Sequence, residues 1–168
     1  VNNAKVIFKD VDASNGVIHV IDHVLMPPTQ NLVQLAQSNP DLSTLVAAVV
    51  QAGAVGLLES DGPFTVFAPT NMAFQNALAA LGYSALVDVP NDALLNILAY
   101  HLIGARVFSY NLSDGLMPQT VQGGTVTISL NGGAKVKGNG NSTASNIVAV
   151  DILATNGVVH VIDQVLLP

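Results

Sequence analysis

Four histidines and the carboxylates near them are the side chains of this sequence best suited to acid–base or metal chemistry. His19 and His23 are four residues apart, but the apolar, β-branched residues around them predict a strand. In a strand that spacing separates the two side chains by about 13 Å. Asp10, Asp12 and Asp22 do not follow the spacing of a calcium-binding loop. The sequence therefore predicts no metal site and no cofactor.

The sequence also lacks the signatures of nucleophilic and phosphoryl-transfer catalysis. It contains no G-x-S-x-G, no phosphate-binding Gly-Lys-Ser/Thr loop and no H-E-x-x-H. Glu59 is the only glutamate and has no obvious carboxylate partner. The fold could still bring a serine and a histidine together, so an enzyme or a small-ligand carrier stays as an alternative. That alternative predicts a deep pocket with convergent polar groups. The sequence favours a protein that is not an enzyme.

The last thirteen residues place His160 and Asp163 in an apolar strand that follows an Asn156-Gly157 turn. Apolar residues occupy both alternating faces, which is typical of a central strand covered on both sides. Because buried polar groups need hydrogen-bond partners, we expect His160 to bond a backbone carbonyl or a nearby side chain. Asp163 is expected to cap a turn or to bind backbone amides. Both residues are predicted to be structural.

This strand segment occurs twice in the chain. Residues 10–27 align without a gap with residues 151–168, at an offset of 141, and twelve of the eighteen pairs are identical. The offset exceeds a solenoid unit and matches a whole domain of about 100–150 residues. The simplest interpretation is a tandem array in a longer protein, in which residues 1–28 end one copy and residues 29–168 form a complete copy. The alternative is one domain in which the two homologous strands pair.

Composition and charge narrow the function classes further. Half of the residues are hydrophobic and 10% are charged, enough for a sizeable core. No apolar run reaches the roughly 18 residues of a membrane span, and cysteine is absent. With a net charge of −6 and a single arginine, Arg106, the chain is poorly suited to nucleic acid or anionic lipid. Its many Asn, Ser, Thr and Gly residues are typical of an extracellular module.

Apolar spacing predicts helices in the first half and strands in the second. Helices are expected over residues 31–38, 39–52, 70–82 and 90–104. Strands are expected at residues 4–9 and 17–25 of the tail, then at 64–68, 106–110, 117–121, 125–130, 134–137, 146–150 and 158–166. The small, polar loop 138–145 should be exposed and mobile. Segregation of helices from strands predicts an α+β fold.

Two motifs resemble the signatures of fasciclin domains. Residues 64–71, followed by Ala73-Phe74, are similar to the first signature, and residues 156–168 to the second, which residues 15–27 repeat. The resemblance covers residues 29–168. It implies a fasciclin-like α+β fold, a β-sandwich or wedge of mixed strands with a group of helices packed at one side. The motif residues expected to support this fold are Thr65, Phe67, Pro69, Thr70, Asn71, Phe74, Asn156, Gly157, His160 and Asp163.

The resemblance also implies partner-binding residues. Tyr100-His101 resembles a tyrosine–histidine motif, and Asp151-Ile152 an aspartate–isoleucine segment, which are implicated in integrin contact in animal members of the family. For Tyr100 and His101 the alternative is simple packing at a helix end. This sequence lacks the basic residues that flank those motifs in several animal relatives, so the implied role is adhesion without an assigned integrin partner.

The resulting expectation is a non-enzymatic, extracellular cell-adhesion or matrix-binding module that recognises a protein or glycan partner through its surface. A purely structural spacer in a cell-surface array is the alternative. Asn111 and Asn141 begin N-glycosylation sequons in predicted turns. Because so much of tail 1–28 is apolar, we expect it to pack on the complete domain, or to pair with a neighbouring molecule by homophilic contact or strand exchange.

Overall fold

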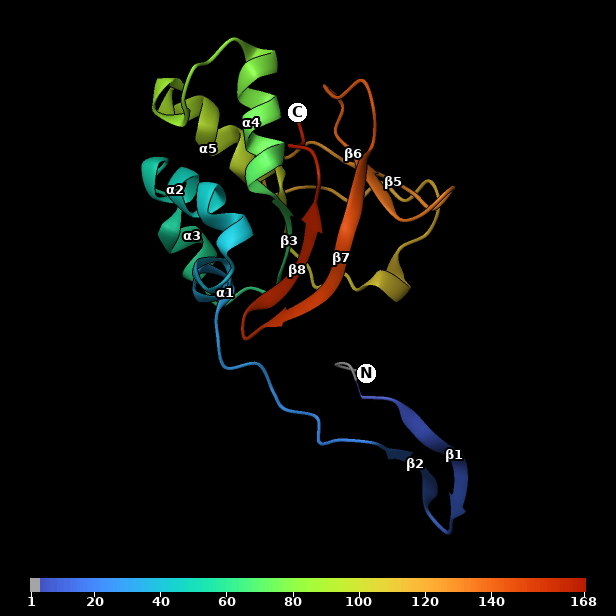
Figure 1. The fold of residues 1–168 in the computed structure, drawn as a ribbon. Helices are drawn as coiled ribbons and strands as arrows, with labels where there is room; N and C mark the ends of the chain where they lie inside the picture. Colours follow the sequence, from blue (N-terminus) through green and yellow to red (C-terminus); the bar gives the residue numbers. More distant parts are fainter. Residues whose placement is uncertain (1–3) are drawn as a thin grey trace.

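The two copies of the repeated segment form two similar hairpins in separate sheets (Figure 1). The protein is described by a computed structural model that covers residues 4–168. Near its start, β1 (Val6–Ala13) and β2 (Gly16–Ile21) form a two-stranded sheet. The second copy, β7 (Ser145–Ala154) and β8 (Gly157–Ile162), belongs to a six-stranded sheet. The alternative of one domain in which the homologous strands pair is therefore wrong.

The six-stranded sheet has the order β4-β3-β8-β7-β6-β5 and is built around β8. Strand β3 (Phe64–Pro69) runs parallel to β8, with Phe64 opposite Gly157 and Pro69 opposite Ile162. The other neighbours are antiparallel. The short outer strands are β4 (Leu102–Ile103), β5 (Thr127–Ser129) and β6 (Lys135–Lys137). A central, doubly covered closing strand is confirmed, because every residue of β8 is buried.

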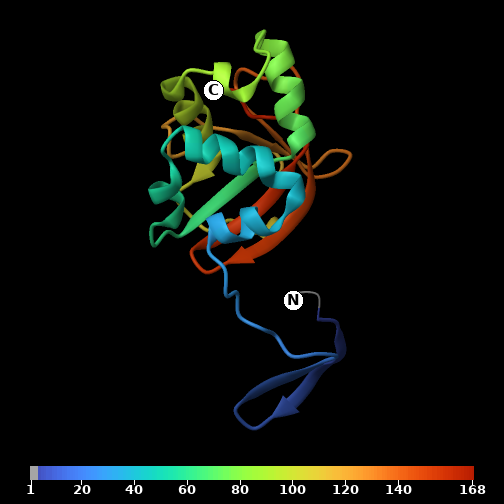
Figure 2. The ribbon, with the colours of Figure 1, turned by 60° about the vertical axis from the view of Figure 1, so that its left-hand side comes forward.

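The helices come mainly from the first half of the chain and cover one face of the sheet (Figure 2). They are α1 (Leu32–Ser38), α2 (Ser43–Gln51), α3 (Val55–Glu59), α4 (Asn71–Leu81) and α5 (Asn91–Tyr100), with 3-10 turns at Pro40–Leu42, Leu86–Asp88 and Ser109–Asn111. Asn31 forms a capping box at α1, Thr70 caps α4, and Gly82 ends α4 in the left-handed conformation. Over residues 4–168, no helix has the length and apolar character needed to cross a membrane.

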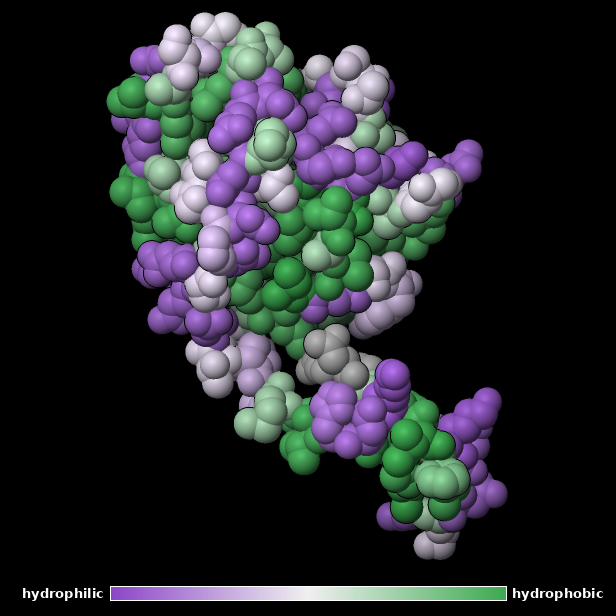
Figure 3. All heavy atoms as spheres, viewed as in Figure 1, coloured by the Kyte–Doolittle hydropathy of each residue, from purple (hydrophilic) through white to green (hydrophobic). Residues whose placement is uncertain are grey.

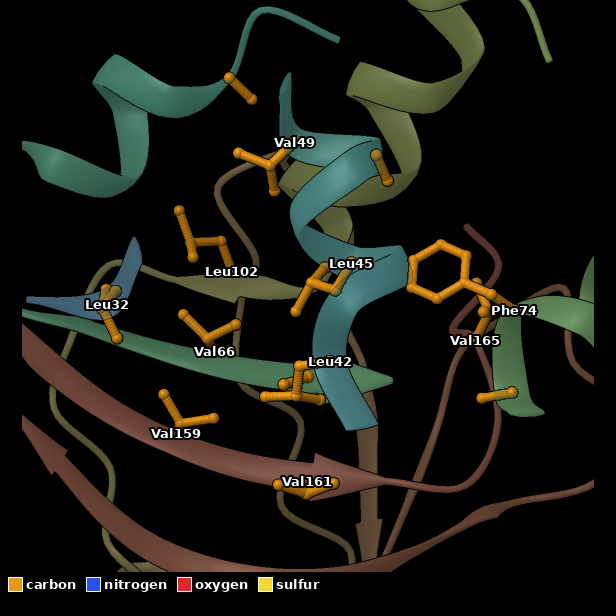
Figure 4. Packing of buried hydrophobic residues seen from close by; sticks show 14 of the residues in the cluster. Leu32, Leu42, Leu45, Val49, Val66, Phe74, Leu102, Val159, Val161 and Val165 are labelled. Atoms are coloured by element: carbon orange, nitrogen blue, oxygen red, sulfur yellow. The ribbon is translucent and has the colours of Figure 1, made fainter. Parts of the chain in front are cut away.

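Hydrophobic residues pack on both faces of the sheet. On the helical side, Val66, Val159 and Val161 point from the strands toward Leu42 and Leu45 of the helical layer (Figure 4). A second buried cluster joins the opposite face to the later strands and loops; it comprises Phe67, Tyr100, Ile103, Leu112, Val126, Ile128, Val136, Ile162 and Leu166. Alternation along β3 explains the division, since Val66 and Phe67 belong to opposite clusters. The α+β prediction is confirmed by this arrangement.

Three segments differ from the sequence-based expectation. Residues 106–110 and 117–121 are not strands, although Gln119 makes one isolated bridge with Thr125. The first is held by side chains rather than by a strand ladder, and Pro118 in the second has no N–H to donate. The loop 138–145 is not simply exposed and mobile. It folds against the C-terminal segment, where a Cβ on Gly138 would lie 2.5 Å from the Leu167 carbonyl oxygen.

The N-terminal hairpin projects away from the six-stranded body (Figures 1 and 2). Its apolar side chains are largely exposed: Phe8 is 67% exposed, Val17 is 57% exposed and Ile18 is 53% exposed. The expectation that tail 1–28 packs on the complete domain is therefore wrong for the described part of the tail, and residues 1–3 lie outside the described residues. An exposed apolar surface of this extent is typical of a site of protein contact.

Candidate partner-binding surface

Tyr100 lies at the end of α5 and is completely buried. Its hydroxyl donates a hydrogen bond to the Thr125 carbonyl (2.5 Å) and accepts one from the Asn139 N–H (3.0 Å). A Cβ on Gly124 would meet the Tyr100 ring at 2.9 Å, so a glycine is needed beside it. Tyr100 therefore holds loop segments against the core. This corrects the expectation that its side chain contacts a partner.

His101 is also interior, with only 2% of its surface exposed. Its Nδ1–H donates to the Ile97 carbonyl (2.8 Å), and Nε2 accepts from the Leu166 N–H (2.8 Å). Burial lowers the pKa of His101 from 6.5 to about 4, although the bond to Ile97 opposes the shift. The imidazole is therefore neutral at pH 7 and joins α5 to the C-terminal segment. Like Tyr100, it packs at the helix end and is not available to a partner.

His160 organises a β-bulge in β7. Ala149 pairs with Val161 and Ile152 with Val159, so two residues of β7 lie opposite His160. The second of these, Asp151, has a φ of 58° and donates its N–H to His160 Nδ1 (3.3 Å). The left-handed conformation is one that aspartate tolerates better than most residues.

The other ring nitrogen of His160 faces the backbone of the segment that follows β4. Nε2–H donates to the Val107 carbonyl (2.9 Å), as expected for a structural histidine. Burial lowers the pKa of His160, while the bond to Val107 and the charge of Asp151 oppose this shift. Both nitrogens are thus engaged by a neutral ring, which leaves His160 no free nitrogen for catalysis.

Asp151 and Thr65 hold the segment 105–109 from two sides. The Asp151 carboxylate accepts from the N–H and the hydroxyl of Ser109 (2.7 and 2.5 Å). Thr65 Oγ1 donates to the Ala105 carbonyl and accepts from the Val107 N–H (2.6 and 2.8 Å). Thr65 of the first signature motif, Asp151, and His160 of the second motif therefore dock this segment, which explains why it is not a strand.

Exposed apolar side chains gather over β7 beside this bulge (Figure 3). Val148 and Val150 are 58% and 41% exposed, and Tyr110, next to Ser109, is 77% exposed. Strand β6 pairs with β7 through Ser145 and Asn146, and within residues 4–168 no strand pairs with residues 148–150 on that side. We call this strip the bulge surface; it consists of Tyr110, Val148, Val150, Asp151 and Ile152. It contains two of the four predicted partner-binding residues, Asp151 and Ile152, which are half-buried: Asp151 is bound by Ser109, and Ile152 packs against the helical-side cluster.

The remaining residues of the first motif connect helices to the sheet. Thr70 accepts from the Ala73 N–H and so caps α4. Asn71 accepts from the Thr44 N–H (2.8 Å) and donates to the Pro40 carbonyl (2.9 Å), joining the start of α4 to the start of α2 and the 3-10 turn before it. The buried Phe67, Pro69 and Phe74 fill the core or end β3.

The second motif fastens the β7–β8 turn and the end of β8. Asn156 is buried; its Oδ1 accepts from the Leu32 N–H, and its Nδ2 donates to the Leu58 and Ser60 carbonyls. A Cβ on Gly157 would lie 2.5 Å from the Phe64 carbonyl oxygen.

The Asp163 carboxylate accepts hydrogen bonds from the backbone N–H and from the side-chain Nδ2 of Asn146 (2.8 and 2.7 Å). It accepts a third from the Ser145 hydroxyl (2.9 Å). Burial alone would raise the pKa of Asp163, but these bonds outweigh it and lower the pKa. The predicted bonding of Asp163 to backbone amides is confirmed.

The two sequons differ in their surroundings. Asn111 is exposed, and its Oδ1 accepts from the Phe108 N–H. Asn141 is half-buried, donates from Nδ2 to the Val165 carbonyl (2.9 Å) and accepts from the Leu167 N–H (2.8 Å). Because a glycan is attached at Nδ2, modification of Asn141 would disturb this bond. Asn111 is the better acceptor of the two.

Sequence reasoning missed Ser109 and Tyr110. The side chain of Ser109 fixes the carboxylate of Asp151, and Tyr110 stacks on Phe108 with ring centroids 5.3 Å apart. A predicted strand over 106–110 concealed them. The available signal was Asn111, whose side chain can bond a backbone N–H three residues earlier and so favours a turn.

Comparison with known proteins agrees with the motifs. The family model described as the fasciclin domain matches residues 1–27 and 40–168. The chain belongs to the fasciclin domain family. Its fold is the family fold, because a solved FAS1 domain pair from the insect cell adhesion molecule fasciclin I aligns with 98% of this chain and 60% of its own chain. That alignment has a TM-score of 0.71 and 25% sequence identity.

Relatives occur in animals and bacteria. The pig transforming growth factor-beta-induced protein ig-h3 is 36% identical over all of this fasciclin chain, which spans 24% of that relative's length. Human periostin is 34% identical, again over the whole chain, which spans 19% of its length. Protein sll1483 of Synechocystis is 38% identical over 89% of this chain and 79% of its own length. The chain thus spans a quarter or less of the two animal relatives.

Proposed function

We propose that this fasciclin domain is a non-enzymatic adhesion or matrix-binding module that acts outside the cell and recognises a protein or glycan partner through the bulge surface. The alignment of nearly the whole chain with a domain pair from a cell adhesion molecule carries the proposal. The bulge surface supports it, since its exposed valines and tyrosine are side chains of the kind that form the centre of protein contacts.

Attachment of cells to the immobilised whole chain tests this function. Self and host cells are added to coated surfaces, and the chain is applied in parallel to glycan and matrix-protein arrays. An adhesion module gives saturable attachment or binding that soluble chain competes away. Attachment no greater than on an uncoated surface, together with empty arrays, would contradict adhesion and leave the spacer role.

The spacer role has its own support, because the N-terminal hairpin is built like the closing hairpin of a fasciclin domain. Registers in β1–β2 and β7–β8 are the same after the offset of 141, with Val6 opposite Ile21 as Ile147 is opposite Ile162. Asp10 repeats the positive φ, at 57°, and its N–H donates to His19 Nδ1 (3.1 Å). The hairpin therefore keeps the local geometry of its counterpart.

The contacts that β7–β8 makes with its own body have no counterpart in the hairpin. Asn15 corresponds to the buried Asn156, yet Asn15 is exposed. Gly16 corresponds to Gly157, but a Cβ on Gly16 would meet nothing within 4 Å. Asn15 and Gly16 are therefore the residue types that would pack against a body similar to residues 29–144. We infer that the hairpin closes a preceding fasciclin domain, so that residues 1–28 and 29–168 belong to successive copies.

A designed chain tests this arrangement. Residues 29–144 are fused directly before residue 4, because residue 4 stands where residue 145 stands in the repeat. The inference predicts a second folded body, in which the amide hydrogens of residues 17–21 exchange far more slowly than in the original chain. Rapid exchange at these amides, with the original body still folded, would contradict it. If the hairpin instead packs on a neighbouring molecule, residues 17–21 of the original chain should be protected from exchange to a degree that rises with protein concentration.

A further inference from the structure

Helices α1, α2 and α3 leave a cavity of about 340 Å³ between themselves and the sheet. Its floor is formed by Val66 and Ala68 of β3 and by Val159 of β8. Leu35 and Ala36 of α1 form one wall, and Val46 of α2 belongs to another. The close view shows Val66 and Val159 pointing from the sheet toward the helical layer (Figure 4).

The chemistry of the walls selects an apolar occupant. The side chains of the floor and of the walls just named have no hydrogen-bonding groups, so a buried polar group of a ligand would lose its bonds to water without replacement. The polar residues lining the cavity are Gln34, Gln37 and Glu59, and all three are exposed to solvent. A ligand would therefore place a hydrocarbon chain inside and its polar end among these three side chains. Glu59 supplies the one charge of the lining, which disfavours an anionic end.

The volume of the cavity limits the length of the hydrocarbon chain that it can hold. An apolar cavity of roughly 150 Å³ accommodates one benzene ring, so about 340 Å³ has room for on the order of a dozen carbon atoms. An empty cavity of this size forfeits dispersion contacts along its walls, and a hydrocarbon occupant would restore them.

We propose that this cavity binds the single hydrocarbon chain of a small, uncharged amphiphile free in solution, with its polar end beside Gln34, Gln37 and Glu59. This site lies on the helical side of the sheet and is separate from the bulge surface. Binding there does not depend on the adhesive role.

Methyl spectra of the whole chain, titrated with 1-decanol below its solubility limit, test the proposal. Saturable shifts and intermolecular nuclear Overhauser effects are expected at the methyl groups of Leu35, Val66 and Val159. The exposed valines of the hairpin, such as Val17 and Val20, act as internal controls for non-specific contact. Absence of saturable shifts, or shifts confined to the hairpin, would overturn the proposal.

A matched pair of substitutions locates the site. Ala36→Phe fills the cavity and should weaken decanol binding at least tenfold. Ala47→Phe, on an exposed position of α2 outside the cavity, should leave binding within twofold. Thermal unfolding shows whether each variant is folded. If Ala36→Phe does not fold, the wild-type titration still decides the proposal; if it folds and binds decanol like the wild type, the cavity is not the site.

Discussion

At the residue scale, His101 and His160 are neutral core residues, each with a hydrogen bond at both ring nitrogens. His101 donates from Nδ1 and accepts at Nε2, whereas His160 accepts at Nδ1 and donates from Nε2. Protonation would turn each accepting nitrogen into a donor that faces another N–H. Burial therefore lowers the pKa of both rings and keeps them uncharged, although the bonds that they donate to the Ile97 and Val107 carbonyls oppose this shift.

This arrangement predicts a loss of stability in acid. The unfolded chain binds a proton at an ordinary histidine pKa of 6.5, whereas folded His101 does so only near pH 4. The free energy of unfolding should therefore fall as the pH is lowered from 6.5 to 4, by up to about 3 kcal/mol from His101. Denaturant unfolding across this range measures the fall. His101→Gln should lessen it, and an unchanged slope would remove His101 as its source.

The glycines of the two turns give a second residue-scale prediction. Gly157→Ala places a Cβ 2.5 Å from the Phe64 carbonyl oxygen, so it should lower the free energy of unfolding by about 2 kcal/mol. Gly16→Ala meets open space and should change stability by less than about 0.5 kcal/mol. Denaturant midpoints of the two variants are compared directly. Equal effects would mean that the two turns have the same surroundings.

At the element scale, the β7–β8 turn fixes the positions of two helices relative to the sheet. Asn156 bonds the first N–H of α1 and two carbonyls at the end of α3, while Phe64 N–H donates to the Asn156 carbonyl (3.1 Å). One side chain thus satisfies helix-end groups that have no partner within their own helices. The equivalent turn of the hairpin has no helices to hold.

Asn156→Ala should therefore be strongly destabilising. It leaves the Leu32 N–H and the Leu58 and Ser60 carbonyls without the side-chain bonds they now make, which we expect to cost about 3 kcal/mol in unfolding free energy. Asn15→Ala is the matched control, since Asn15 occupies the same position in the exposed hairpin. Thermal unfolding followed by circular dichroism measures both. A loss below about 1 kcal/mol for Asn156→Ala would contradict the anchoring role.

At the scale of the whole molecule, periodicity and the repeat were enough to predict the α+β fold, the central closing strand and helices near α1, α2, α4 and α5. They did not predict α3, nor β4, which lies within the helix expected over 90–104. They could not predict where Tyr100 and His101 point, because both lie at a helix end whose surroundings come from residues distant in sequence. The strand expected at 106–110 failed for the same reason. Its backbone is bound by Thr65 and His160, a tertiary contact that outweighs local β-propensity.

The hairpin posed a different problem for sequence reasoning. Its apolar residues predicted buried surface, but within residues 4–168 most of their side chains are exposed. The repeat predicts that the N-terminal segment forms a strand pair. It does not predict whether that strand pair is covered, because both hairpins have nearly the same sequence.

Attachment of cells to a Val150→Lys variant tests the central claim, adhesion through the bulge surface, most directly. Lys9 occupies the equivalent position of the hairpin with the same register, so lysine is compatible with this backbone. Val87→Lys, at a 76% exposed position between α4 and α5, is the matched control. With both variants as stable as the wild type, attachment should fall at least fivefold for Val150→Lys and stay unchanged for Val87→Lys. Equal attachment by all three proteins would contradict the claim.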